Sequence, residues 1–213
     1  MKLYGFSRSS AAFRVRIALN LKGLDSEQVF VHLRRHEQER PEFLGVNPQG
    51  LVPALETDGL TLIQSLPIVE YLDERHPEPP LLPRDPAGRA RVRALAAIVA
   101  CDIHPINNLR VLRYLHGPLG HDEAAIAAWY NHWIETGFHA LEPLLAGDPR
   151  TGAFCHGDAP GLADIALVPQ VVNSERYRLN LAAFPTIRRI YETCMTLDAF
   201  AHAHPTRQPD YEP

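Results

Sequence analysis

The sequence of 213 residues predicts two parts, a mixed α/β domain followed by an all-helical domain. Strand and helix patterns alternate as far as His76, whereas only helical patterns follow Ala87. Between them, Pro77–Pro86 holds five prolines in ten residues, which is typical of an extended linker. We therefore expect one domain at 1–80 and a helical domain at 87–213.

The first domain has the predicted element order β-α-β-α-β-β-α. Its strands are expected at Lys2–Phe6, Gln28–Leu33, Ala54–Thr57 and Leu60–Ile63, and its helices at 10–21, Pro41–Val46 and Ser65–His76. Asp58-Gly59 is a strong hairpin signal between the last two strands. With Pro53 directly before the third strand, this order is the thioredoxin-like arrangement, although the usual Cys-x-x-Cys motif is missing.

The second domain is predicted to consist of four helices without a sheet. They are expected from Ala87 to about Leu115, Asp122 to about Leu145, Leu162 to about Glu175, and Phe184 to about His202. The tail 205–213 is expected to be weakly ordered.

The composition narrows the possible partners. The chain is 46% hydrophobic and 22% charged, and its net charge of -4 argues against a nucleic-acid or anionic-membrane surface. Met1 leads directly into a strand without a leader, so a cytoplasmic protein is expected. The cysteines Cys101, Cys155 and Cys194 are far apart, which favours buried thiols over disulfides or a metal site.

A socket for a small peptide is predicted where two segments of the first domain meet. A cis bond before Pro53 would turn the amide and carbonyl of Val52 outward, to pair with an extended ligand. Gln64 and Ser65 stand at a strand-to-helix junction, where free N–H groups, the helix dipole and a hydroxyl favour a carboxylate. The expected ligand has a peptide edge and an α-carboxylate.

Several motifs resemble those of the zeta-class glutathione transferases. Ser9–Leu19 resembles the signature of that class, and Cys101–Asn108, Leu167–Gln170 and Glu175–Tyr177 resemble its maleylacetoacetate and maleylpyruvate isomerases. Ala11 departs from the signature, which usually carries cysteine there. Gly161 departs where Ser or Thr usually caps a helix, and losing that bond costs a few tenths of a kcal/mol.

The resemblance implies glutathione as the cofactor and assigns the residues that hold it. Ser9 is the expected partner of the thiolate and Ser10 the second candidate; the alternative is that both only cap the helix. The resemblance also places glutathione against Gln38, Val52, Gln64 and Ser65, with a solvated side chain as the alternative for Gln38. Pro53 is the expected cis residue.

The second substrate implied by the resemblance is a small dianion, because maleyl compounds carry two carboxylates. Arg8, Arg110 and Arg176 are the expected cations, since a guanidinium binds carboxylate in two parallel bonds. His104 and Asn108 are expected to stand on the cofactor side as donors to the charge that develops. The alternatives are solvated arginines and a helix kink at His104-Pro105.

The resulting hypothesis is a homodimeric, glutathione-dependent cis-trans isomerase acting on maleylpyruvate or maleylacetoacetate in aromatic-acid breakdown. Thiolate addition to the alkene would allow rotation, and elimination would give the trans product. Two alternatives stay open. One is a general transferase for small electrophiles or α-halo acids, and the other is a non-enzymatic binding module of the same fold.

Overall fold

The computed structural model describes residues 1–212, which form two compact units. Unit 1 comprises Met1–Leu81 and the chain from Met195 onward, and unit 2 comprises Leu82–Cys194. The residues after Met195 join unit 1 because α9 (Asp198–Ala201) packs against α1 (Ser10–Leu21). From the sequence, the residues after Met195 were expected to belong to the helical domain. The domain limits 1–80 and 87–213 stay a prediction.

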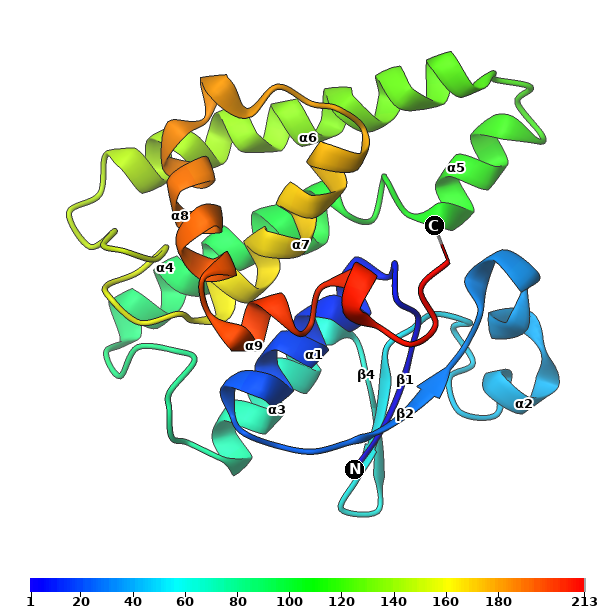
Figure 1. The fold of residues 1–213 in the computed structure, drawn as a ribbon, viewed down its shortest axis with the longest axis horizontal. Coiled ribbons are helices and arrows are strands. Elements are labelled where there is room, and N and C mark those ends of the chain that lie inside the picture. Colours follow the sequence, from blue (N-terminus) through cyan, green and yellow to red (C-terminus); the bar gives the residue numbers. More distant parts are fainter. Residues whose placement is uncertain (213) are drawn as a thin grey trace. The chain divides into compact units, whose positions relative to one another are not determined.

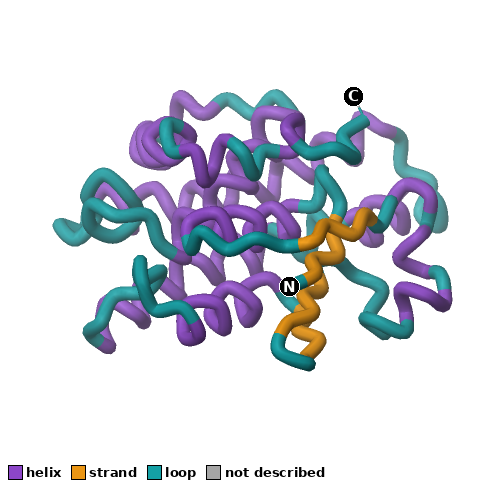
Figure 2. The backbone as a smooth tube through the Cα atoms, turned by 60° about the horizontal axis from the view of Figure 1, so that its bottom comes forward, coloured by secondary structure: helices purple, strands orange, loops and turns teal. Residues whose placement is uncertain are grey.

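Unit 1 contains a four-stranded mixed sheet with the order β2-β1-β3-β4. The strands are β1 (Lys2–Gly5), β2 (Glu27–Phe30), β3 (Ala54–Thr57) and β4 (Leu60–Ile63). β1 runs parallel to β2 and antiparallel to β3, and β3 and β4 form a hairpin. Figure 2 shows the strands in orange, all within unit 1. The predicted thioredoxin-like order is confirmed.

Helices cover both faces of this sheet. α1 and α3 (Ser65–Arg75) pack together on one side, and α2 (Pro41–Leu44) lies on the other (Figure 1). The side chains between α1, α3 and the sheet are fully buried, among them Leu3, Phe13, Ile17, Leu55 and Ile68. Burial of such side chains contributes about 1.5–3 kcal/mol each. This core fixes the loops at the ends of the strands.

Two local predictions in unit 1 can be compared with the structure. The hairpin turn is confirmed, with positive φ angles of 50° at Asp58 and 75° at Gly59, as a type I′ turn requires. The second strand was predicted too long at its end. It stops at Phe30 because His32 starts a tight turn, in which its Nδ1 accepts from the Arg35 N–H at 3.2 Å.

Unit 2 is built from helices. They are α4 (Pro86–Ala97), a π-helix at Ile98–Ile103, α5 (Leu109–His116), α6 (Glu123–Ala146), α7 (Leu162–Arg176) and α8 (Pro185–Met195). The prediction of one helix over 87–115 is wrong, because Pro105 has no N–H to continue the ladder. Asn108 then starts α5 by accepting from the Arg110 N–H at 3.1 Å.

The C-terminal region also differs from its prediction. The helix predicted over 184–202 is broken after Met195, so α8 and α9 are separate. The tail was expected to be weakly ordered, and this is wrong for residues 205–212. Asp210 accepts a hydrogen bond from the Ser7 N–H at 2.8 Å, and Pro205–Arg207 form a 3₁₀ turn. Pro213 lies outside the described residues.

Remaining expectations about single residues are partly confirmed. Cys155 and Cys194 are buried as predicted, whereas Cys101 is exposed. Gly161 starts α7 without a side-chain bond, and the buried Asp164 carboxylate accepts from the N–H groups of Gly161 and Cys155 at 2.9 and 2.8 Å. Within residues 1–212, no helix combines the length and apolar character needed to span a membrane.

Candidate active site

The candidate residues of unit 1 gather at one end of its sheet. Arg8, Ser9 and Ser10 follow the end of β1, Gln38 follows the parallel β2, Val52 and Pro53 precede the antiparallel β3, and Gln64 and Ser65 follow β4. Strand direction alone therefore brings segments that are far apart in sequence to the same edge. His104, Asn108, Arg110 and Arg176 belong to unit 2.

Ser9 caps the first helix. Its backbone is extended, with φ -75° and ψ 113°, and its Oγ accepts from the Ala12 N–H at 3.2 Å. Within residues 1–212, the hydroxyl hydrogen of Ser9 has no acceptor. The oxygen can therefore cap α1 while the O–H donates to a ligand. Ser10 is buried inside the first turn of α1. The geometry favours Ser9 over Ser10 as a donor.

Val52 offers an unpaired backbone edge. The Val52-Pro53 bond is cis, as predicted. Neither the N–H nor the C=O of Val52 forms a hydrogen bond within residues 1–212. Backbone groups near a protein core are nearly always paired, so an unpaired donor and acceptor on one residue suit an extended peptide ligand.

Gln64 and Ser65 form the start of α3. Gln64 has φ 69° and ψ 123°, a conformation that residues other than glycine rarely adopt. Its Nε2 donates to Gln49 Oε1 at 2.7 Å. Ser65 is buried, and its Oγ accepts from a guanidinium N–H of the buried Arg14 at 3.2 Å. The open N–H groups of the helix start and the nearby cation favour an anionic group here.

Gln38 is buried, so the solvated alternative considered for it is wrong. Its Nε2 donates to Glu39 Oε1 at 2.8 Å, while its own Oε1 is enclosed without a hydrogen-bond partner within residues 1–212. A buried oxygen without a donor costs free energy, about 1–3 kcal/mol. A ligand N–H would relieve this cost.

Together these groups fit a tripeptide thiol. The Val52 edge matches a peptide unit, the start of α3 matches a carboxylate, and the Ser9 hydroxyl matches a thiolate. All three are backbone groups or a small hydroxyl, so they recognise a ligand through the positions of its hydrogen-bonding atoms. The donor set therefore fits glutathione.

Two cations of unit 2 have no anionic partner among the described residues. Arg110 on α5 and Arg176 at the end of α7 are exposed, and neither side chain forms an ion pair within residues 1–212. Arg176 lies over the ring of Tyr177, 5.7 Å from its centroid. His104 and Asn108 are half-buried in the connection before α5. Asn108 caps α5, so its side-chain oxygen is already engaged.

Helix α6 holds the segments that carry both cations. Asn107 donates from its side chain to the Tyr130 carbonyl at 3.0 Å, and Trp129 Nε1 donates to the Ile106 carbonyl at 3.0 Å. Tyr130 stacks on Tyr177, with ring centroids 3.7 Å apart. These contacts anchor the segment shortly before Arg110, and the residue after Arg176, to adjacent positions of α6.

Sequence reasoning missed the buried arginines of α1 and the acidic tail. Arg14 is 1% exposed and Arg16 is 6% exposed, and Arg16 donates to the carbonyl oxygens of Phe6, Ser7 and Ala203 at 3.4, 3.0 and 3.1 Å. The sequence did contain a signal for their burial, because both arginines alternate with the apolar residues Phe13, Val15 and Ile17. No local signal pointed to Asp210, which contacts Ser7 from 203 positions away.

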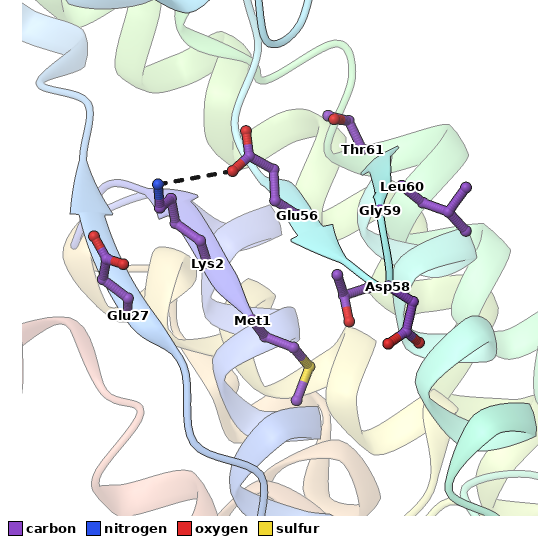
Figure 3. A pocket seen from close by; sticks show the side chains of 9 residues that line it. Met1, Lys2, Glu27, Glu56, Asp58, Gly59, Leu60 and Thr61 are labelled. Atoms are coloured by element: carbon purple, nitrogen blue, oxygen red, sulfur yellow. Dashed lines mark ion pairs between the residues drawn. The ribbon is translucent and has the colours of Figure 1, made fainter.

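A pocket of about 520 Å³ lies elsewhere on unit 1 (Figure 3). Its walls include Lys2, Glu56 and the hairpin turn at Asp58, and Lys2 pairs with Glu56 at 3.8 Å. The antiparallel register places this turn at the opposite end of the strands from Ser9 and Val52. It is therefore distinct from the candidate site. Within residues 1–212, no group of three potential ligands is arranged for a metal ion.

Comparison with known proteins gives one consistent family. Residues 3–80 match the model of the glutathione S-transferase N-terminal domain. A maleylpyruvate isomerase of Ralstonia is 54% identical, covering 99% of each chain. A solved holo structure of a maleylpyruvate isomerase, described as a bacterial zeta-class glutathione S-transferase, superposes with a TM-score of 0.98 at 54% identity and full coverage of both chains.

A second similar solved structure is that of a maleylacetoacetate isomerase. The maleylacetoacetate isomerase of Methylobacterium extorquens, with bound malonate and glutathione, has a TM-score of 0.96 at 46% identity and covers both chains fully. Identity at this level over the whole length of both chains shows common ancestry and a common fold. The chain belongs to the zeta-class glutathione transferase family of maleylpyruvate and maleylacetoacetate isomerases.

Proposed function

We propose that this chain is a glutathione-dependent cis-trans isomerase of a maleyl keto acid, either maleylpyruvate or maleylacetoacetate. The observation that carries the proposal is the Ser9 hydroxyl, free to donate at the start of α1 and at the same end of the sheet as the unpaired Val52 edge. The relatives that match over the full length are named for these two substrates.

In this proposal, unit 1 binds glutathione and favours its thiolate. An ordinary thiol has a pKa of about 8.5, so a depression of about two units is needed, equal to about 2.7 kcal/mol. A hydrogen bond to a charged group contributes about 1.5–3 kcal/mol, and the start of a helix about 0.3–1 kcal/mol. The Ser9 hydroxyl and the α1 dipole together are therefore sufficient in magnitude.

The remaining contacts in unit 1 orient the tripeptide. Val52 pairs with its peptide unit through backbone N–H and C=O, and Gln64 and Ser65 bind its γ-glutamyl end through the start of α3. The unpaired Gln38 Oε1 accepts a ligand N–H. When bound, glutathione supplies a sulfur nucleophile that adds to the alkene and leaves again, so the former double bond can rotate.

Unit 2 supplies cations for the dianionic substrate. Arg110 and Arg176 bind its carboxylates, because their guanidinium groups are exposed and have no anionic partner within residues 1–212. Arg8 of unit 1 is the third proposed cation. His104 and Asn108 act as donors to oxygen atoms where negative charge develops. Malonate in the Methylobacterium extorquens structure is likewise a dicarboxylate, bound with glutathione in that protein.

The test compares isomerisation with conjugation. Maleylpyruvate and maleylacetoacetate are incubated with the protein, with and without glutathione, and the trans product is followed by absorbance. A chlorinated aromatic acceptor is assayed in parallel. The proposal requires glutathione-dependent isomerisation of at least one maleyl substrate. Conjugation without isomerisation would indicate a general transferase, and absence of heat on titration with glutathione would indicate a non-enzymatic module.

Three further expectations belong to this proposal. We propose a homodimer, a cytoplasmic location and no nucleic-acid partner, in agreement with the net charge of -4. The mass in solution, measured by light scattering, tests the first of these. A monomer that retains full activity would contradict the dimer and leave the proposed reaction intact.

A further inference from the structure

The last described residues of the chain contact the loop that carries Ser9. We call Asp210–Glu212 the C-terminal clasp. It belongs to unit 1, and Figure 1 shows the end of the chain, in red, running past α1 toward the loop after β1. The inference rests on the proposed function, because it concerns the groups that bind glutathione and substrate there.

Asp210 holds Ser7, two positions before Ser9. The Ser7 N–H donates to Asp210 Oδ2 at 2.8 Å, and the Ser7 hydroxyl donates to the Asp210 carbonyl at 3.3 Å. Ser7 is 1% exposed, so water does not replace these partners. A hydrogen bond between a backbone N–H and a carboxylate is among the stronger ones in proteins.

Arg16 holds the same loop from the other side. Its guanidinium donates to the carbonyls of Ser7 and Phe6 at 3.0 and 3.4 Å, and to the Ala203 carbonyl at 3.1 Å. Burial lowers the pKa of Arg16 to about 10, an effect opposed by the Asp210 carboxylate. Arg16 stays charged at neutral pH. Ser7 is therefore fixed at its N–H by Asp210 and at its C=O by Arg16.

The same clasp contacts Arg8. Arg8 donates to the Glu212 carbonyl, and its guanidinium lies 5.3 Å from the centroid of the Tyr211 ring. The Glu212 carboxylate is anchored in turn by Arg35 and by His32, whose Nε2 lies 3.2 Å away. The residue before Ser9 is thus oriented by the clasp, which is itself tied to the turn after β2.

The contacts of this loop are linked to Ser9 by the carbonyl oxygen of Phe6. The Phe6 carbonyl accepts from both the Ser9 N–H, at 2.9 Å, and Arg16. A shift of the loop at Ser7 would therefore move Ser9 as well. Displacing a reacting group by about 1 Å can lower a rate about a hundredfold. We propose that the C-terminal clasp, through Asp210, is a positioning element that sets the Ser9 hydroxyl and the Arg8 guanidinium for reaction.

The test uses three substitutions in the chain of 213 residues and one shortened chain. Asp210→Ala removes the acceptor for the Ser7 N–H, Asp210→Asn keeps an acceptor oxygen without the charge, and Arg207→Gln is the matched control. Arg207 lies in the same tail and forms no side-chain hydrogen bond or ion pair within residues 1–212. A chain ending at Pro209 removes the whole clasp. The measurements are kcat and KM, the ultraviolet absorbance of bound glutathione thiolate against pH, and the midpoint of thermal unfolding.

Asp210→Ala is expected to lower kcat/KM about tenfold and to raise the pKa of the bound thiol by about one unit. In Asp210→Asn, both kcat/KM and the pKa of the bound thiol should stay close to the wild-type values. Arg207→Gln should match the wild type. The shortened chain should also raise KM for the maleyl substrate, because Arg8 loses its contacts. A purely structural contact would lower the unfolding midpoint and leave the thiol pKa unchanged.

The outcomes separate the clasp from the proposed reaction. Wild-type kcat and thiol pKa in folded Asp210→Ala would overturn the positioning role. If Asp210→Ala does not fold, wild-type kcat and thiol pKa in the shortened chain would overturn the positioning role instead. An inactive wild-type protein that still binds glutathione would refute the proposed reaction, whereas the thiol pKa of the variants would still test the clasp.

Discussion

Replacing Ser9 with alanine tests the central chemical step. In the structure, Ser9 Oγ accepts from the Ala12 N–H at 3.2 Å, and its hydroxyl hydrogen has no acceptor within residues 1–212. The substitution therefore removes two separate interactions. Loss of the helix cap lowers the free energy of unfolding by about 1 kcal/mol. Loss of the donor to the thiolate costs about 1.5–3 kcal/mol in the glutathione complex.

The second loss has a defined effect on pH dependence. Because the hydroxyl stabilises the charged form, its removal raises the pKa of the bound thiol by about 1–2 units. At neutral pH, kcat/KM should fall about tenfold to a hundredfold, in proportion to the lost thiolate. The rising limb of the pH profile should move upward by the same 1–2 units, and the difference from wild type should shrink at alkaline pH.

Two companion variants make the experiment decisive. Ser9→Gly also lacks the hydroxyl but keeps most of the helix start, so it should reproduce the catalytic loss with only a few tenths of a kcal/mol in stability. Ser10→Ala tests the second candidate. The assays are initial rates against pH and urea unfolding. An unshifted pH profile in both Ser9 variants would refute the assignment, and a shift in Ser10→Ala would transfer it to Ser10.

Three further predictions address other parts of the chain. Arg176→Ala should raise KM for the maleyl dianion at least tenfold while calorimetry shows unchanged glutathione affinity; Arg178→Asn is the control, since its φ of 58° suits asparagine. Gln64→Gly should weaken glutathione binding by calorimetry but raise the free energy of unfolding by about 1 kcal/mol, because it relieves a φ of 69°; lower stability would contradict this. Asp164→Ala should lower urea-measured stability by about 2–4 kcal/mol, because two N–H groups lose their acceptor; Asp164→Asn should cost less.

The parts of the fold predicted from sequence depend on local signals. Asp58-Gly59 fixes a hairpin through its backbone preference, and Asp122 caps α6 by accepting from the Ala125 N–H at 2.8 Å. The proximity of the candidate residues in unit 1 depends on local signals in the same way. Ser9, Val52 and Gln64 each stand at the end of a recognisable strand, and strand order then brings them to one edge.

Other features could not be predicted because distant residues decide them. The helical pattern continues through residues 98–108, yet the chain leaves the α-helix there, and Asn107 and Ile106 bond to α6 instead. The tail has few apolar residues and looks weakly ordered by composition. Its order comes from single polar contacts with Ser7 and His32, and such contacts cannot be inferred from composition.

The buried arginines of α1 connect the fold to the proposed chemistry. Enclosing a charge costs several kcal/mol unless hydrogen bonds compensate, so apolar side chains at these positions would serve stability alone at least as well. Arg14 donates to Ser65 Oγ, and Arg16 donates to the carbonyls of the loop before Ser9. Each cation thus supports one of the two segments proposed to bind the same tripeptide, one at its thiolate and the other at its γ-glutamyl end. Since neither lies on the surface, their contribution is to hold those segments and to place positive charge behind them. The proposed function therefore explains two buried charges that packing alone does not.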